Sequence, residues 1–131
     1  MSDEDGKGWE KPGKSLRILV VEDHGDTRRT LSRLLSYFGH KISAADSKYS
    51  ALEMIAAKKF DVLLSDIALP DGTGYEIMAQ AKRDQPIKGV ALTGLDRDED
   101  INRGKEAGFD YYLNKPVDFH QLRTVLGKVS L

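Results

Sequence analysis

The pattern of apolar and polar positions divides the chain, from Leu16 onward, into short apolar runs that alternate with longer amphipathic stretches. The runs are mostly apolar at successive positions, and they are Leu16–Val21, Lys41–Ala45, Asp61–Ser65, Lys88–Leu92 and Phe109–Leu113. A strand that is apolar on successive residues buries both of its faces, which is typical of parallel sheets. The pattern therefore predicts five buried strands.

The stretches between these runs repeat apolar residues every three or four positions, which is the spacing of one helix face. The stripes are Leu31, Leu34, Leu35 and Phe38; Ala51, Leu52, Ile55 and Ala56; Ile77, Met78 and Ala81; and Phe119, Leu122, Leu126 and Val129. Gly39 follows the first stripe as a stop signal, and Asp118 precedes the last as a natural N-cap. We expect four helices with these stripes buried.

The segment Asp96–Glu106 differs from the other helical stretches. Ile101 is almost its only apolar residue, and Gly104 lowers its helix propensity. A helix with so little apolar surface gains little from packing, so we expect this one to be poorly anchored.

Five strand–helix units in about 115 residues predict an α/β fold, a doubly wound five-stranded parallel sheet with helices on both faces. Right-handed crossovers place the active crevice at the carboxyl ends of the strands, where the strand order reverses. The fold alone does not name a function, because many chemistries share it.

Composition restricts the function classes. Residues 1–15 are mostly Gly, Lys, Asp and Glu and are expected to form a linker or tail, which leaves 16–131 as one domain. The net charge of −1 comes with no basic block for nucleic acid, and no apolar run reaches the roughly 18 residues of a membrane span. The chain has no cysteine. We expect a cytoplasmic module that contacts neither nucleic acid nor membrane.

Polar side chains follow four of the predicted strands. Glu22 and Asp23 come after the first strand, Asp66 after the third, Thr93 after the fourth and Lys115 just past the fifth. Parallel strands end at one edge of a sheet, so these side chains should converge there if the first and third strands are neighbours.

Three close carboxylates repel one another and need a counter-charge. Without a His or Cys cluster, the natural counter-ion is a hard divalent cation, and Mg²⁺ suits carboxylates with phosphate oxygens and water, with Mn²⁺ as a substitute. Carboxylate, cation, ammonium and hydroxyl together stabilise a phosphoryl group in transfer, and a carboxylate can itself be the nucleophile.

The chain from Leu16 to Val129 resembles the receiver domain of two-component response regulators, the CheY-like family with a flavodoxin-like fold. The matching segments, in order, are Val20–Asp23, Asp66–Gly72, Leu92–Gly94, and Ala107–Gly108 through Lys115–Pro116. The resemblance implies the strand order 2-1-3-4-5 and a phosphorelay function.

By this resemblance, Asp66 is the phosphoacceptor. Asp23 and Asp66 would ligate Mg²⁺ directly, Glu22 would act through water, and Ala68 would give its backbone carbonyl. Lys115 would pair with phosphoryl oxygens and would precede a cis peptide bond to Pro116.

The resemblance also implies a switch and partners. Thr93 would hydrogen-bond the phosphoryl group, and Tyr112 would be the aromatic switch residue. The donor would be a histidine kinase or a histidine phosphotransfer domain. A downstream protein would bind the face formed by the fourth helix, fifth strand and fifth helix of the predicted fold. Such a domain catalyses its own phosphorylation and dephosphorylation but acts mainly as a signalling switch.

Several alternatives remain at this stage. A flavin-binding module would need a Ser/Thr/Gly loop where Glu22 and Asp23 stand. A haloacid-dehalogenase-like phosphatase would need an Asp-x-Asp motif after the first strand, which this chain lacks. An interaction module that has lost phosphorylation would not need the acidic cluster that this chain keeps. His24 is interpreted as a surface residue at a helix start rather than a metal ligand. The chain is a stand-alone regulator or, as the tail and the Leu69–Gly74 segment favour, the receiver of a hybrid histidine kinase.

Overall fold

The computed structural model describes residues 15–94 and 98–130. Apart from Ser15, the expected tail over residues 1–15 lies outside the described residues, as does the expected helix start at Asp96. Among the described helices, none is long and apolar enough to cross a membrane.

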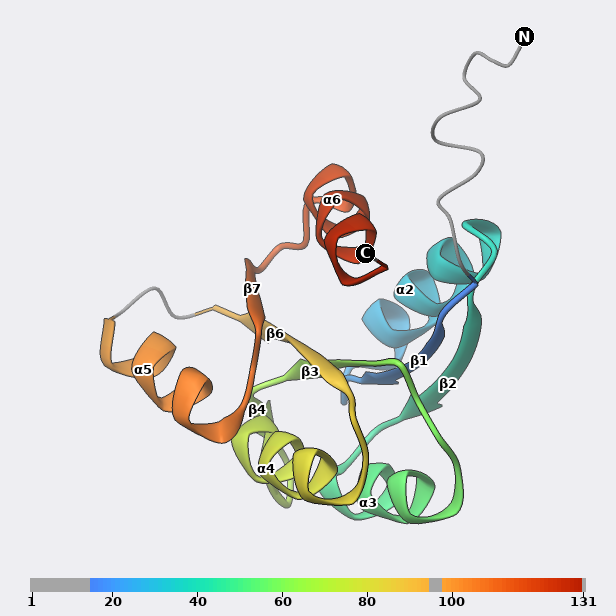
Figure 1. Cartoon of the computed structure of the whole chain (residues 1–131). Helices are drawn as coiled ribbons and strands as arrows, with labels where there is room; N and C mark the ends of the chain where they lie inside the picture. The colour runs from blue at the N-terminus through green and yellow to red at the C-terminus, as the bar shows by residue number, and fades with distance from the viewer. Residues whose placement is uncertain (1–14, 95–97, 131) are drawn as a thin grey trace, which may run out of the picture.

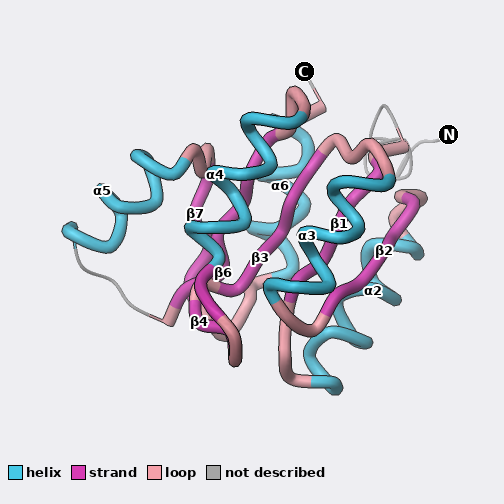
Figure 2. The backbone as a smooth tube through the Cα atoms, turned by 90° about the horizontal axis from the view of Figure 1, so that it is seen from below, coloured by secondary structure: helices cyan, strands magenta, loops and turns pink. Residues whose placement is uncertain are grey.

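The core of the fold is a parallel sheet, shown in Figures 1 and 2. Its strands in chain order are β1 (Arg17–Val21), β2 (Lys41–Ala45), β3 (Val62–Asp66), β6 (Lys88–Thr93) and β7 (Tyr111–Asn114). They lie in the order β2-β1-β3-β6-β7, and every pair is parallel. The predicted order 2-1-3-4-5 is therefore confirmed, with β1 and β3 as neighbours.

Helices cover both faces of this sheet (Figure 1). The helices are α2 (Gly25–Tyr37), α3 (Lys48–Ala57), α4 (Gly74–Asp84), α5 (Asp98–Ala107) and α6 (Phe119–Val129). On β1, Ile18 and Val20 pack in the core that contains residues of α2 and α6, whereas Leu19 and Val21 pack in the core that contains residues of α3 and α4. Successive apolar residues thus fill two opposite cores, as expected for a buried parallel strand.

A small antiparallel hairpin follows β3 and was not predicted. It pairs β4 (Ala68–Leu69) with β5 (Gly72–Thr73). Asp71 lies in its turn and accepts hydrogen bonds from the backbone N–H groups of Lys48 (2.7 Å) and Tyr49 (2.9 Å). The turn residue therefore satisfies free donors in the first turn of α3 and ties that helix to the segment that follows Asp66.

The helix signals were correct at most ends, but two apolar residues of the predicted buried stripes, Ala56 and Phe119, are exposed. Gly39 adopts the positive φ of 97° that ends α2, and Asp118 caps α6 by accepting from the N–H groups of His120 and Gln121. Phe119, expected in the core, is 44% exposed. It is the first residue of α6, and although its spacing to Leu122 and Leu126 puts it on the same side of the helix, its ring points toward the first turns of α2 rather than into the core.

His40 fixes the start of β1. It is buried, and its Nδ1 accepts a hydrogen bond from the N–H of Leu16 at 3.0 Å. An acceptor nitrogen carries no proton, so this bond requires the neutral ring. Desolvation by burial lowers the pKa of His40 from its ordinary value of 6.5.

We predict that His40 makes the fold less stable in mild acid. Because its pKa is lower in the folded state, its contribution is present above the unfolded pKa and is lost as pH falls below it. Urea unfolding at about pH 7.5 and about pH 5.5 should show a larger loss of unfolding free energy for the wild type than for His40→Gln. His120→Gln, an exposed control, should behave as the wild type, and equal losses in all three proteins would contradict the prediction.

Candidate functional site

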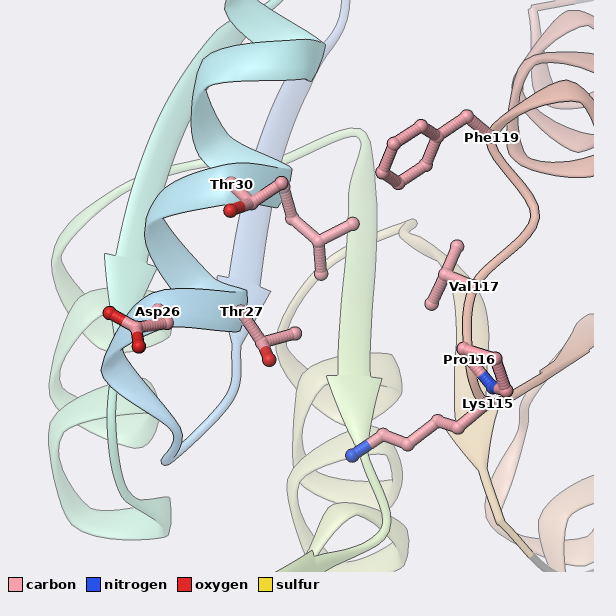
Figure 3. A pocket seen from close by; sticks show the side chains of 8 residues that line it. Asp26, Thr27, Thr30, Lys115, Pro116, Val117 and Phe119 are labelled. Atoms are coloured by element: carbon pink, nitrogen blue, oxygen red, sulfur yellow. The ribbon is translucent and has the colours of Figure 1, made fainter.

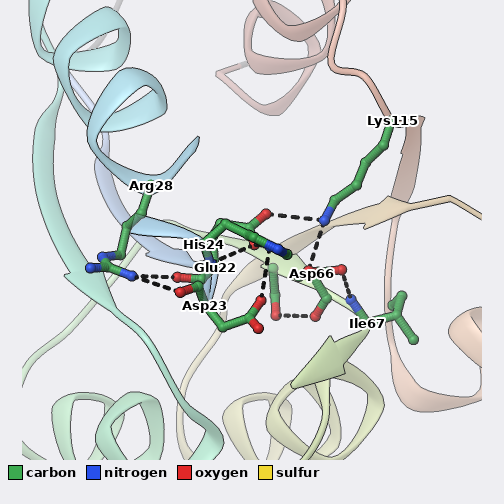
Figure 4. Close-up of polar contacts among 8 residues, drawn as sticks. Glu22, Asp23, His24, Arg28, Asp66, Ile67 and Lys115 are labelled. Atoms are coloured by element: carbon green, nitrogen blue, oxygen red, sulfur yellow. Dashed lines mark hydrogen bonds and ion pairs between the residues drawn. The ribbon is translucent and has the colours of Figure 1, made fainter. Parts of the chain in front are cut away.

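Of the polar residues predicted to converge, Glu22, Asp23, Asp66 and Lys115 meet at the carboxyl edge of the sheet (Figure 4). Glu22 follows β1 directly, Asp66 is the last residue of β3, and Thr93 is the last residue of β6. Lys115 follows β7 and reaches back across this edge toward β1 and β3. The parallel register brings these strand ends side by side, which is how distant segments of the chain form one pocket.

Lys115 links two carboxylates. Its Nζ lies 2.7 Å from Oδ2 of Asp66 and 3.1 Å from Oε1 of Glu22. The Glu22 side chain is 0% exposed, so its charge has no access to bulk water and depends on such partners. The second oxygen of Asp66, Oδ1, accepts the N–H of Ile67 at 2.8 Å.

The surroundings of the pocket shift the pKa values of Asp66, Glu22 and Lys115. Burial raises the pKa of Asp66, an effect that Lys115 opposes and the charge of Glu22 reinforces. Burial also acts to raise the pKa of Glu22, but the His24 backbone N–H and the Lys115 ammonium outweigh it and leave that pKa lowered. Burial disfavours the charged form of Lys115, yet the two carboxylates outweigh this and raise its pKa.

The donor set fits a hard divalent cation. Glu22 Oε1 is buried and has no well-aligned hydrogen bond among the described residues, its contact being the ion pair with Lys115. Glu22, Asp23 and His24 each place one ligand atom within 4.8 Å of the others. Carboxylate oxygens of this kind are the ligands that Mg²⁺ prefers. Ala68, expected to contribute a carbonyl, lies in β4 just past Asp66.

Two residues near the carboxylates make contacts that the sequence analysis did not identify. Nη1 of Arg28, one turn into α2, donates to the backbone carbonyls of Glu22 (2.9 Å) and Asp23 (3.4 Å). His24 is an exposed residue at the start of α2, as expected, and it also places Nδ1 3.3 Å from Glu22 Oε2. The position of His24 directly after Glu22 and Asp23 could have indicated this contact, whereas nothing in the sequence pattern indicated the contacts of Arg28.

The loop after β7 is held against the end of β6. The backbone N–H of Lys115 donates to the carbonyl of Thr93 at 2.9 Å, and Thr93 itself is buried. The Lys115–Pro116 peptide bond is cis, as expected. Thr93 and Lys115 are therefore adjacent at the pocket.

Tyr112 connects β7 to α5. Its hydroxyl donates to the carbonyl of Ile101 at 3.1 Å, and its ring packs on Gly104. A Cβ atom at Gly104 would lie 2.7 Å from Cε1 of Tyr112, closer than real Cβ contacts. Gly104, read from the sequence as a weak point of the helix, is thus the residue that admits the tyrosine ring. Arg103 adds a contact with its guanidinium carbon 4.6 Å from the ring centre of Tyr75 in α4.

A groove opens beside the pocket between the start of α2 and the loop leading into α6 (Figure 3). Its volume is about 330 Å³, and Lys115 belongs to both the groove and the acidic pocket. The groove is lined on the α2 side by Thr27, Thr30 and Leu31 and on the other side by Val117 and Phe119. The exposed ring of Phe119 forms one wall of this groove.

A doubly wound parallel sheet with buried carboxylates and a lysine at its carboxyl edge defines a receiver-type domain. Residues 18–127 match the family model of the response regulator receiver domain, and the chain belongs to this family. It is therefore a receiver domain of a two-component signalling system.

Individual relatives agree with the family. The chain is 38% identical over 111 residues to response regulator MprA of Mycobacterium ulcerans, covering 82% of this chain and 47% of MprA. It is 32% identical over 126 residues to the virulence sensor protein BvgS of Bordetella pertussis, covering 90% of this chain and 10% of BvgS. The chemotaxis protein CheY4 of Vibrio cholerae superposes with a TM-score of 0.83 at 26% identity, covering 88% of this chain and 99% of that one.

We predict that Lys115→Met destabilises the fold and raises the pKa of Asp66 further. Removing the ammonium leaves Glu22 and Asp66 as buried carboxylates without a counter-charge, which should lower the unfolding free energy by about 1–3 kcal/mol. Urea unfolding and carboxyl-carbon NMR titration measure the two effects. Lys82→Met, which removes the more peripheral partner of Asp110, is the control and should cost no more than about 1 kcal/mol. Equal costs for both variants would contradict the prediction.

Proposed function

We propose that the chain accepts a phosphoryl group on Asp66 from a phosphohistidine, with Mg²⁺ bound, and changes its surface as a result. The observation that supports this most is the placement of Asp66 at a strand end with the Lys115 ammonium 2.7 Å from its carboxylate. That pairing favours the ionised, nucleophilic form of Asp66 against the effect of burial.

The residues suit an in-line transfer. An oxygen of Asp66 attacks phosphorus, the phosphorus–nitrogen bond of the phosphohistidine breaks, and its electron pair stays on the leaving imidazole. Lys115 then pairs with the phosphoryl oxygens, and the Thr93 hydroxyl donates a hydrogen bond to one of them. Asp23 and Asp66, with Glu22 through water and the Ala68 carbonyl, would hold Mg²⁺, which supplies charge neutralisation for the transferring group.

We place the donor over the groove beside Lys115. A histidine presented to Asp66 must approach from the open side of the pocket, and this groove adjoins it through Lys115. Leu31, Val117 and Phe119 give it an apolar lining, which suits an apolar protein surface better than a small ion. A histidine kinase or histidine phosphotransfer domain would bind there. The likeness to the sensor protein BvgS supports a parent protein of the hybrid-kinase type.

The output would be read on the face formed by α5, β7 and α6. A phosphoryl group adds about 1.5–2 negative charges beside Thr93. Movement of the Thr93 hydroxyl toward it would vacate space that the Tyr112 ring can enter. Because Tyr112 also holds the Ile101 carbonyl, such a movement would reposition α5. A downstream protein would distinguish the two arrangements.

We predict that acetyl phosphate labels the protein only when Asp66 and Mg²⁺ are both present. Asp66→Asn should abolish the acid-stable, base-labile label, because the amide cannot form an acyl phosphate, and Asp23→Asn should lower Mg²⁺ affinity and labelling together. Asp84→Asn, an exposed aspartate at the end of α4, is the control and should label normally. Normal labelling of Asp66→Asn, or of the wild type in excess chelator, would refute the proposal.

We predict that the phosphoryl mimic beryllofluoride changes amide hydrogen exchange at Thr93, over residues 101–107 and around Tyr112. Thr93→Ala should shrink these changes while Asp66 still takes phosphate, because it removes the hydroxyl that couples the two regions. Thr124→Ala, which removes a hydroxyl bonded to His120 within α6, should leave them intact. Changes confined to the acidic pocket would show that no switch operates.

A further inference from the structure

His24 is placed to contribute a nitrogen to the acidic pocket. It is the N-cap residue of α2, and its backbone N–H donates to Glu22 Oε2 at 3.1 Å, which fixes the turn between β1 and α2. Its Nδ1 lies 3.3 Å from the same Oε2 and 3.5 Å from Oδ1 of Asp23. The imidazole therefore faces both carboxylates, as Figure 4 shows.

These distances match the separations between ligand atoms that bind the same metal ion. Ligand atoms bound to one transition-metal ion at about 2.0–2.1 Å lie about 3.0–3.4 Å from one another. The two distances from His24 Nδ1 fall at or just above that range. The His24 side chain is 76% exposed, so a cation can reach its ring from solvent.

No other histidine in the chain is arranged in this way. Of the three, His40 is buried with its Nδ1 occupied by the Leu16 N–H, and His120 lies on the exposed side of α6. The chain has no cysteine. Among the described residues, the only clustered set of metal-ligating side chains is therefore Glu22, Asp23 and His24.

We propose that His24 is a metal-selectivity residue, which lets the acidic pocket bind Zn²⁺ through Nδ1 together with the Glu22 and Asp23 carboxylates. The inference rests on the proposed cation site and adds to it a preference set by this chain's own residue. Imidazole nitrogen suits Zn²⁺ and similar borderline cations, whereas Mg²⁺ takes oxygen ligands. Zn²⁺ and Mg²⁺ would share Asp23 and compete for the pocket, but only Zn²⁺ would use His24.

The experiment compares the wild type, His24→Gln and the control His120→Gln, each titrated calorimetrically with Zn²⁺ and with Mg²⁺. His24→Gln should weaken Zn²⁺ binding by about tenfold or more and leave Mg²⁺ affinity within about twofold. His120→Gln should match the wild type for both ions. Two-dimensional ¹⁵N spectra of the imidazole rings should show the His24 Nδ1 resonance moving with Zn²⁺ and staying in place with Mg²⁺.

Two outcomes would overturn this inference and leave the proposed function intact. One is Zn²⁺ affinity that His24→Gln does not change, and the other is a His24 Nδ1 resonance that Zn²⁺ does not move, each with Mg²⁺ still binding in an Asp23-dependent way. Failure of Mg²⁺ to bind the wild type at all would count against the proposed cation site instead. Asp23→Asn, which should weaken both ions, separates the two cases.

Discussion

The ion pair from Lys115 to Asp66 and Glu22 is the interaction on which the rest of the site depends. Two carboxylates from neighbouring strands lie at one buried edge, and each would disfavour the ionisation of the other without a cation between them. The ammonium comes from a segment 49 residues beyond Asp66, so the charges balance only when β7 is in place beside β6. The sheet must therefore be complete before the charges in the pocket are balanced, and the contact that stabilises the fold also favours the ionised form of the proposed nucleophile.

Much of this arrangement could be predicted from the sequence because it follows from two periodicities. Apolar runs predicted the strands, and apolar stripes at three- and four-residue spacing predicted the helices. A polar residue directly after a run lies at the carboxyl edge of a parallel sheet. Asp66 and Thr93 were found in this way, as the terminal residues of β3 and β6. Lys115 follows β7 by one residue, and the same logic reached it.

The features that escaped prediction depend on turns and side-chain directions rather than on periodicity. Asp71 caps α3 across a hairpin of two-residue strands, a length too short to leave a pattern. Phe119 shares the spacing of the buried stripe, yet it is exposed because it lies in the first turn of α6, where its ring borders the groove. Arg28 reaches backbone carbonyls, which every residue has, so its target is invisible in the sequence.

The attachment of α5 shows how a helix with few apolar residues is held against the sheet. Its side toward the sheet has little apolar surface, and the structure substitutes one hydrogen bond from Tyr112, a ring seated on Gly104 and a cation–π contact from Arg103. Each is worth about 1 kcal/mol, far less than a buried apolar stripe. Two of these three contacts belong to Tyr112, so a movement of that one side chain would remove both. Tyr112 pairs with Ala91, two residues before Thr93 on β6, so a helix held by this side chain is placed to follow the proposed change at Thr93, whereas one held by a broad apolar face would not be.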